Sequence, residues 1–523
     1  MPCALGCPHL PLRPSSHVKR ITTDVTSRHG PHRPKQHTWS RLFLPFSKVS
    51  LSPLANVLPI RIQNHTMFFL FLLICWSSFS SDSRAEDYVK LPVFRQSPFP
   101  TAREALALDS VRLSFFSSSS SISNASASHP PPPAALSAPV VSGASSGAGQ
   151  FFVDLHLGTP PQRLRLVADT GSDLVWARCS ACRDCSRHPP VTAFFPRHSS
   201  SFRPYHCYHP ACRLVPHPRS SSHDAAPPCR RQPLHSPCRY RYSYADRSSS
   251  AGFFSRDIAT LNSTSAGILR LHSLPFGCAF NITSPAGSEA PRGVLGLGRG
   301  PISFPSRAAR RFGDVFSYCL MDYTLSPPPT SFLLIGAAAH TTLAPKNLSF
   351  TPLLTNPLSP TFYYVRVLGV SVDSEPLRVD PSVWALDHAT GIGGTVVDSG
   401  TTLSFVPEAA YRKIVRAMTR RLPPPAIVRG PPEFDLCVNA SAEATKRVPR
   451  LAFRLLGGTE LAPPAGNYFI DAADGVRCLA MQPVSTAGPG FGVIGNLMQQ
   501  GFLLVFDRRA HRLGFSRTGC TDA

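Results

Sequence analysis

VADTGS at residues 167–172 and VVDSGT at residues 396–401 are two copies of one short pattern, and this pattern decides the fold. In each copy an aspartate follows hydrophobic residues and precedes a glycine that permits a tight turn. One such copy is common in loops, whereas two copies indicate two similar lobes that meet at a shared site. We therefore expect Asp169 and Asp398 to face each other across a pseudo-two-fold axis.

Two carboxylates brought close together have a specific chemical use. Like charges at short range do not both ionise easily, so such a pair holds one proton over an acidic pH range. The ionised member can take a proton from water while that water attacks a peptide carbonyl, and the protonated member can donate to the developing oxyanion. This chemistry needs neither a metal nor a covalent intermediate, so we expect no cofactor.

From residue 149 to residue 523 the chain resembles the pepsin-like aspartic endopeptidases. In that family each loop is backed by two hydrophobic residues and a glycine, which occur here as VLG at 294–296 and VIG at 493–495. The resemblance implies an all-β dominated, bilobal fold with a few short helices and a central cleft between two pseudo-symmetric lobes. It implies an N-terminal lobe at 149–345, with a Cys-rich insert and a flap, and a C-terminal lobe at 346–523.

The resemblance also implies roles for the residues around the aspartates. Ser172 and Thr401 would hydrogen-bond the outer carboxylate oxygens, and Thr170 and Ser399 would tie the two loops together. The supporting set expected from the resemblance is Thr170, Gly171, Ser172, Trp176, Ser399, Gly400 and Thr401.

A hairpin flap in that family carries a tyrosine that bonds a tryptophan after the first loop. Trp176 fits the tryptophan, Tyr244 is the first candidate for the tyrosine, and Tyr242 is the reserve. Core packing is the alternative role for these aromatic side chains. Ala245 stands where the family usually has glycine, and Arg247 lies in the turn, which predicts a stiffer and more basic flap tip.

The start of the chain differs in composition from the rest. Residues 1–66 are basic and nearly free of acidic residues, and an apolar run, MFFLFLLICW, follows at 67–76. That run is too short to span a bilayer comfortably, so residues 67–81 are interpreted as a signal peptide with Met67 as the working start. Residues 1–66 are then a non-structural upstream extension. An organellar transit peptide, with a chloroplast destination, is the alternative.

Residues 82–148 resemble a propeptide followed by a linker. A serine run at 117–121 and a proline run at 130–133 predict an extended and solvated segment. Its basic residues could cover the acidic cleft of a zymogen or could be solvated charges; they are Arg84, Lys90, Arg95, Arg103 and Arg112.

The cysteine count favours an oxidising compartment. Fifteen cysteines fall to twelve once Cys3, Cys7 and Cys75 are removed with the leader, and twelve can form six disulfides. The clustered cysteines could also hold zinc or an iron–sulfur cluster, but no set with closed metal-ligand spacing accompanies them, so we expect no metal. The stretch FPRHSSSF at 195–202 and the cysteines after it are similar to the insert of nepenthesin-type plant aspartic proteases. That resemblance implies bridges Cys437–Cys478 and Cys319–Cys520, and the other pairs stay open.

Periodicity predicts mainly strands. Residues 153–157 and 364–367 alternate as half-buried strands do, and the best helix candidate begins after Pro407, where Ala410, Ile414 and Met418 recur at fourfold spacing.

The formal charge of the whole chain is +23. Residues 1–146 hold 14 Lys/Arg and 6 Asp/Glu, which leaves 39 Lys/Arg against 24 Asp/Glu, or a charge of +15, for the remainder. No base-stacking or groove-reading motif accompanies this charge, so we expect no nucleic-acid partner.

These observations predict an aspartic-type endopeptidase that acts as a monomer on an extended peptide. No apolar tail follows Cys520, so we expect no membrane anchor, and a location in the cell wall or outside the cell, or in the vacuole. Secretion would also allow N-glycosylation at five sequons: Asn124, Asn262, Asn281, Asn347 and Asn439. The alternative is a catalytically inactive secreted protein of the same fold that inhibits glycoside hydrolases or binds another partner.

Overall fold

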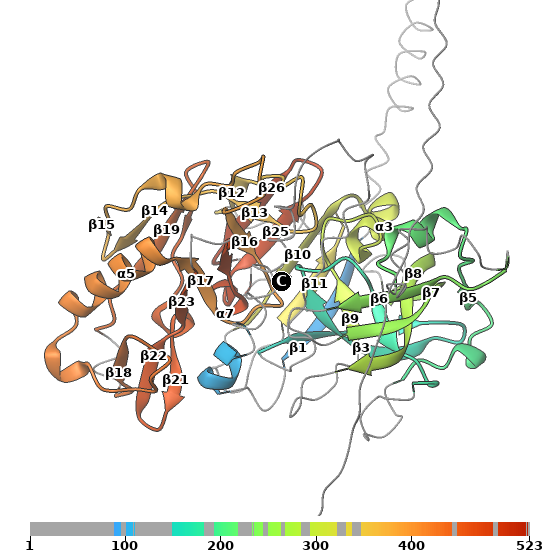
Figure 1. Cartoon of the computed structure of the whole chain (residues 1–523), viewed down its shortest axis with the longest axis horizontal. Coiled ribbons are helices and arrows are strands. Elements are labelled where there is room, and N and C mark those ends of the chain that lie inside the picture. The colour runs from blue at the N-terminus through green and yellow to red at the C-terminus, as the bar shows by residue number, and fades with distance from the viewer. Residues whose placement is uncertain are drawn as a thin grey trace, which may run out of the picture. The chain divides into compact units, whose positions relative to one another are not determined.

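Strands dominate the chain, as the alternating sequence patterns predict (Figure 1). The computed structural model describes residues 88–95, 101–107, 109, 149–182, 193–217, 233, 235–243, 249–262, 267–283, 293–321, 331–336, 347–441, 447–484, 490–518 and 520. All of them belong to one compact unit, Ser81–Ala523. The predicted leader, the serine and proline runs, Asn124, and Tyr244 with Ala245 and Arg247 of the flap lie outside the described residues.

The largest sheet has fourteen strands drawn from both halves of the chain. They are β1 (Val89–Arg95), β2 (Phe151–Leu157), β3 (Gln162–Asp169), β4 (Trp176–Arg178), β5 (Arg203–Pro204), β6 (Arg239–Ser243), β7 (Ser249–Asn262), β8 (Ile268–Thr283), β9 (Gly293–Gly296), β10 (Val315–Cys319), β11 (Ser331–Ile335), β12 (Ser349–Pro352), β25 (Leu503–Asp507) and β26 (Arg512–Ser516). Their order is β12-β26-β25-β10-β11-β1-β2-β3-β9-β4-β8-β7-β5, and β6 pairs with β7. Strands from the end of the chain therefore complete a sheet that begins in the first half.

Three smaller sheets come from the second half. One contains β13 (Tyr364–Val365), β16 (Thr395–Val397), β24 (Gly492–Ile494), β17 (Ser404–Pro407) and β23 (Met481–Val484). Another contains β15 (Glu375–Pro376), β14 (Val367–Val372), β19 (Leu451–Leu455) and β20 (Glu460–Leu461). The last contains β18 (Cys437–Asn439), β22 (Val476–Leu479) and β21 (Phe469–Ala473).

One strand prediction needs correction. Residues 364–367 were expected to form a single strand, but they divide between β13 and β14, which belong to different sheets. The break falls at the exposed Arg366, whose carbonyl accepts the N–H of Leu456 outside either ladder. The other predicted strand, 153–157, lies within β2, where Val153, Leu155 and Leu157 are buried.

Helices are few and short. The α-helices with defined bounds are α3 (Phe304–Phe312), α5 (Glu408–Arg421) and α7 (Asn496–Gln499), and the 3-10 helices are η4 (Pro196–His198), η5 (Pro210–Leu214), η6 (Pro381–Trp384), η7 (Pro424–Ala426) and η8 (Ala465–Asn467). Residues 102–107 are also helical. The predicted helix after Pro407 is confirmed as α5, and its apolar face, which includes Ala410, Ile414 and Met418, is buried. In the part of the chain that the structure describes, no helix is long and apolar enough to cross a membrane.

Part of the segment that resembles a propeptide is built into the fold. Strand β1 lies between β11 and β2, antiparallel to both, and buries Val89, Leu91 and Val93 in the main core. The alternating apolar side chains of these residues fit the inner face of a sheet, whereas the solvated stretch predicted from the serine and proline runs lies outside the described residues. Lys90 lies over the ring of Phe332 at 4.9 Å, an ordinary cation–π contact rather than a cover for an acidic site.

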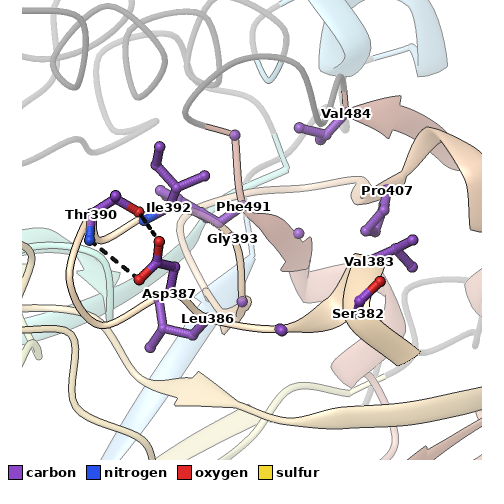
Figure 2. A pocket seen from close by; sticks show the side chains of 14 residues that line it. Ser382, Val383, Leu386, Asp387, Thr390, Ile392, Gly393, Pro407, Val484 and Phe491 are labelled. Atoms are coloured by element: carbon purple, nitrogen blue, oxygen red, sulfur yellow. Dashed lines mark hydrogen bonds between the residues drawn. The ribbon is translucent and has the colours of Figure 1, made fainter. Parts of the chain in front are cut away.

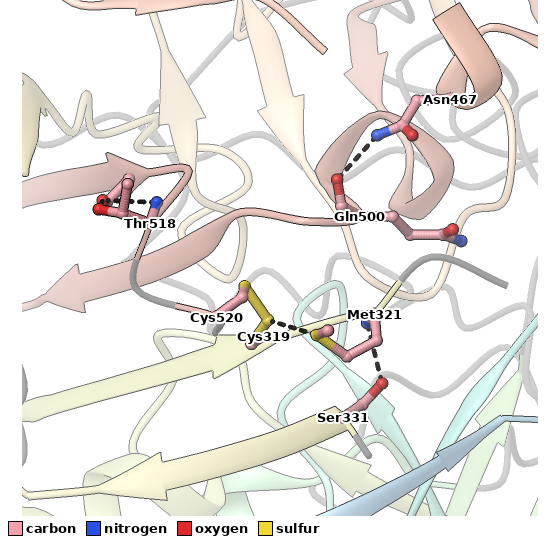
Figure 3. The surroundings of a disulfide bond; sticks show 8 residues. Cys319, Met321, Ser331, Asn467, Gln500, Thr518 and Cys520 are labelled. Carbon is pink, nitrogen blue, oxygen red and sulfur yellow. Dashed lines mark hydrogen bonds between the residues drawn. A yellow bond between two sulfur atoms is a disulfide. The ribbon is translucent and has the colours of Figure 1, made fainter. Parts of the chain in front are cut away.

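Disulfides connect distant parts of these sheets. The structure pairs Cys319 with Cys520 and Cys437 with Cys478, the two bridges that the resemblance implied. Figure 3 shows Cys319 beside Met321, with the two sulfur atoms 3.3 Å apart. Two further bridges, which the sequence left open, are Cys179–Cys278 and Cys212–Cys238. All ten described cysteines are disulfide-bonded.

Candidate active site

Each predicted aspartate lies at the end of a strand that runs parallel to one of the hydrophobic segments ending in glycine. Asp169 is the last residue of β3, and it stands opposite Gly296 of β9. Asp398 directly follows β16, whose Val397 stands opposite Ile494 of β24. The two halves of the chain therefore present their aspartates in the same local arrangement.

The glycines behind the loops permit a very close backbone approach. A Cβ atom at Gly296 would overlap the backbone of Asp173, and one at Gly495 would overlap the carbonyl of Leu403. Any side chain at these positions would push the catalytic loops out of place. Both glycines therefore serve a structural role behind the loops.

Reciprocal hydrogen bonds join the two loops at their centre. The N–H of Thr170 donates to Oγ of Ser399 at 3.0 Å, and the N–H of Ser399 donates to Oγ1 of Thr170 at 2.9 Å. Each hydroxyl then donates across the interface, from Thr170 to the carbonyl of Val397 at 3.3 Å and from Ser399 to that of Ala168 at 3.0 Å. This lattice fixes the loops relative to one another.

The carboxylates are buried and held by their own loops. Asp169 is 0% exposed and Asp398 is 2% exposed. Oδ1 of each accepts the N–H of the glycine two residues later, at 3.1 Å from Gly171 and 3.0 Å from Gly400. Thr401 donates its hydroxyl to Oδ2 of Asp398 at 2.6 Å, as the resemblance implied.

Ser172 differs from its counterpart Thr401. Its Oγ is buried and has no hydrogen-bond partner among the described residues, whereas the resemblance placed it on the outer oxygen of Asp169. The role expected of Ser172 therefore stays a prediction.

Gln499 connects the second loop to the large sheet. Its Nε2 donates to the carbonyls of Asp398 at 3.1 Å and Ile494 at 2.8 Å, and its Oε1 accepts the hydroxyl of Tyr318 at 2.5 Å. Burial, with the nearby charge of Asp398, raises the pKa of Tyr318 well above its usual value, so this hydroxyl stays protonated and donates. Gln499 thus holds the backbone of Asp398 against a strand from the other half of the chain.

Asn496 makes a second set of contacts with the same loop. Its backbone N–H donates to the carbonyl of Thr401 at 2.7 Å, and its Nδ2 donates to the carbonyls of Ser399 at 3.1 Å and Gly149 at 3.2 Å. The side chain is completely buried. Asn496 therefore joins the start of the folded region to the second loop.

Asp173 supports the first loop from behind. Its Oδ1 accepts the N–H of Gly300 at 2.7 Å, and its Oδ2 accepts the hydroxyl of Thr361, from the second half of the chain, at 2.7 Å. Burial raises the pKa of Asp173, and these hydrogen bonds together with the charge of Arg508 oppose the rise.

Comparison with known proteins now identifies the family. Family models described as xylanase inhibitor N-terminal and xylanase inhibitor C-terminal match residues 151–337 and 362–517. Aspartyl protease family protein 2 of Arabidopsis thaliana is 36% identical over 389 residues, which cover 73% of this chain and 74% of that protein. Aspartic proteinase nepenthesin-1 of Nepenthes gracilis is 32% identical over 379 residues, which cover 72% of this chain and 79% of that protein. The chain belongs to the nepenthesin-type plant branch of the pepsin-like aspartic proteases.

Solved structures agree on the fold of this pepsin-like protein. Basic 7S globulin from soybean superposes with a TM-score of 0.57 at 18% sequence identity, and the match covers 83% of this chain and 98% of that chain. The predicted fold class, a β-dominated pepsin-like fold, is confirmed. The two family models lie on either side of the lobe boundary predicted at 345/346, which stays a prediction.

Trp176 and the reserve flap candidate Tyr242 lie in one buried cluster, whereas Tyr244 lies outside the described residues. Trp176, Tyr240 and Tyr242 are buried together in the core behind β6 and β7. Tyr240 bonds the hydroxyl of Ser250 at 2.9 Å. Tyr242 is only 2% exposed, so the reserve candidate is a core residue in this structure, which leaves Tyr244 as the flap candidate.

Two further features of the described residues, a cysteine–histidine cluster and a pocket, lie apart from the two aspartates. Cys212, His217 and Cys238 cluster within 4.8 Å, but the two cysteines form a disulfide and offer no thiolate. Figure 2 shows a pocket of about 350 Å³ in the second half, where Asp387 accepts the hydroxyl and N–H of Thr390. Its lining includes neither catalytic aspartate.

Sequence reasoning missed several residues that support the catalytic loops. Asp173, Asn496 and Gln499 act through backbone groups of distant residues, which produces no recognisable spacing. Only Asp173 and Asn496 offered a signal, since they lie next to the quoted motifs at 167–172 and 493–495.

Proposed function

We propose that this protein is an aspartic endopeptidase that hydrolyses peptide bonds at acidic pH with a water activated between Asp169 and Asp398. The observation that carries the proposal is the completeness of both loops. Thr170 and Ser399 exchange reciprocal bonds, and each aspartate accepts its own glycine N–H. The protease names of the relatives support the same conclusion.

The chemistry follows from two carboxyl groups that share one proton. The ionised carboxylate takes a proton from water as the water oxygen bonds to the peptide carbonyl carbon, and the protonated carboxyl donates its proton to the carbonyl oxygen. The first carboxyl then gives the proton it took from water to the amide nitrogen, one hydroxyl of the tetrahedral intermediate returns its proton to the second carboxylate, and the C–N bond breaks, which releases the amine and the carboxylic acid. Buried N–H and O–H donors, among them those of Gly400 and Thr401, hold the carboxylates in place for both steps.

The substrate in this proposal is an extended peptide or unfolded protein, bound by a monomer without a cofactor. The proposed site of action lies in the secretory pathway or outside the cell. All ten described cysteines are disulfide-bonded, which supports an oxidising compartment. The described sequons Asn262, Asn347 and Asn439 are exposed, which supports access to glycosylation, whereas Asn281 is half-buried in β8.

Cleavage of a denatured globin at about pH 3 to 5 tests the proposal. The full chain, acid-treated and refolded with its disulfides, should cleave the globin in a pepstatin-sensitive reaction, and Asp169→Ala and Asp398→Asn should abolish cleavage. Gly466→Ala is the matched control, because a Cβ there meets open space, and it should leave pepstatin-sensitive cleavage. Absence of cleavage by correctly bridged wild-type protein would refute the proposal.

An inhibitor of glycoside hydrolases is the second candidate, because both family models carry the description of a xylanase inhibitor. Both dyad loops are intact here, which favours the enzyme. The same preparation assayed for inhibition of a xylanase decides between them: inhibition without globin cleavage would favour the inhibitor.

A further inference from the structure

The segment before the catalytic region contacts the second catalytic loop directly. Residues 102–107 form a helix, which Thr101 and Glu104 cap reciprocally: the N–H of Thr101 donates to Oε2 of Glu104 at 2.9 Å, and the N–H of Glu104 donates to Oγ1 of Thr101 at 3.3 Å. The buried side of this helix, including Ala105 and Leu106, belongs to the same apolar cluster as Leu403.

Asp109 ends this segment with a carboxylate inside the protein. The residue is 2% exposed, and both of its carboxylate oxygens lie 3.1 Å from the N–H of Thr402. Oδ2 also accepts the N–H of Leu403 at 2.5 Å. Thr402 and Leu403 are the first residues after the VVDSGT loop that carries Asp398. A buried carboxylate bonded to two backbone N–H groups is a strong, oriented contact.

The first loop has a comparable support from its own residue. Asp173 stands four positions after Asp169, as Thr402 stands four positions after Asp398. In the first loop the buried carboxylate is carried by the loop and accepts N–H and O–H donors from elsewhere. In the second loop Thr402 has no carboxylate, and Asp109 supplies one from 293 residues earlier.

We propose that Asp109 is a positioning residue for the loop of Asp398, so that the described residues 88–95, 101–107 and 109 are a working part of the folded enzyme rather than of a discarded propeptide. This inference rests on the proposed protease function. Strand β1 fixes one end of the segment in the large sheet, and Asp109 fixes the other end on the loop. The segment thereby restrains the backbone that immediately follows the catalytic aspartate.

Steady-state kinetics of the full chain test the proposal, with catalytic sites counted by pepstatin titration. Asp109→Asn keeps the size of the side chain but replaces one carboxylate oxygen by an NH₂ group. This group is a donor and cannot accept the backbone N–H groups of Thr402 and Leu403 as the oxygen does. We expect kcat per titrated site to fall about tenfold, equal to about 1.4 kcal/mol of transition-state stabilisation, with KM unchanged. A purely structural residue would lower the number of titrated sites and leave kcat per site unchanged.

Glu104→Ala is the matched control, because it weakens the same helix without contacting the loop. It should keep the wild-type kcat per site. Mass spectrometry of the pepstatin-bound species should find residues 101–109 still present. Wild-type kcat per site in Asp109→Asn, or a fully active species that lacks residues 101–109, would overturn the inference.

Amide hydrogen exchange separates this inference from the protease proposal. If the wild-type protein neither cleaves globin nor binds pepstatin, the protease proposal fails, and exchange of the peptide containing residues 399–405 is measured instead. Faster exchange in Asp109→Asn, but not in Glu104→Ala, would support Asp109 as the anchor of this loop. Equal exchange in all three proteins would overturn it.

Discussion

Replacing Gln499 by methionine should weaken the support of Asp398 without changing the size of the side chain much. The replacement removes partners from the hydroxyl of Tyr318 and from the carbonyls of Asp398 and Ile494. The Ile494 carbonyl keeps the N–H of Asp398 at 3.2 Å, so the loss falls mainly on the other two groups. At about 1–3 kcal/mol for each of these two stranded buried groups, we expect Gln499→Met to destabilise the fold by about 2–6 kcal/mol.

Tyr318→Phe provides a second test, because the sign of its effect on the free energy of unfolding should depend on whether Gln499 is present. In the wild-type protein it should cost about 1–2 kcal/mol, since it strands the Oε1 of Gln499. In the Gln499→Met background it should instead stabilise by about 1 kcal/mol, because it removes a hydroxyl that has already lost its acceptor. The double variant should therefore be more stable than Gln499→Met alone.

Thermal unfolding at neutral pH, where proposed self-digestion is slow, measures these differences. An unfolding entropy of about 2.1 cal/mol/K per residue over roughly 375 folded residues gives about 1.3 °C of Tm per kcal/mol, which predicts a fall of roughly 3–8 °C for Gln499→Met. Tyr240→Phe is the control, because it removes another buried tyrosine hydroxyl that bonds Ser250 in a different cluster. Its effect should add to that of Gln499→Met. A Tyr318→Phe effect that is equally destabilising in both backgrounds would refute the reasoning.

Three further predictions test other parts of the site. Burial holds the pKa of Asp173 in the folded protein above its ordinary value of 3.8. Between the ordinary pKa and the raised pKa, the folded state binds more protons than the unfolded state. The contribution of Asp173 to the free energy of unfolding therefore falls as the pH rises through this interval. Asp173→Asn should flatten that dependence in Tm measured from about pH 4 to 7, and an unchanged slope would contradict it. Gly495→Ala should abolish globin cleavage because its Cβ would overlap the carbonyl of Leu403, whereas Gly466→Ala, in open space, should be fully active; an active Gly495→Ala would contradict this. Asn439 is exposed, so Asn439→Gln should lower the mass of the secreted protein by the mass of one glycan. If the secreted wild-type and variant proteins have the same mass apart from the substitution itself, the site is unused.

Local patterns explain why much of the fold could be predicted. The apolar face of α5 follows from side chains at fourfold spacing, and the alternating residues of β2 follow from a two-residue period. The repeated loops indicated both aspartates because each loop is complete within six residues. The bonds between Thr170 and Ser399 came only from the family resemblance, since no local rule relates two residues so far apart.

The residues that escaped prediction depend on contacts that leave no sequence period. Gln499 was unremarkable because two of its partners are backbone carbonyls, which every residue has, and the third, the hydroxyl of Tyr318, lies 181 residues away. Strand β1 lies within the segment that resembles a propeptide and was not predicted as a strand, although Val89, Leu91 and Val93 alternate as a buried strand does. Composition averaged over a long segment concealed a short element whose own pattern was clear.

The unequal support of the two loops bears on how the second half of the dyad is assembled. Asp173 travels with its loop, so the first loop carries its buried carboxylate wherever it folds. The second loop must recruit Asp109 from the start of the folded region, and Asn496 and Gln499 from α7 near its end. Closing contacts over such long separations is slow and depends on the surrounding sheets being formed. The loop of Asp398 is therefore expected to order last during folding, and a variant that removes any one of its three supports should affect that loop before it affects the loop of Asp169.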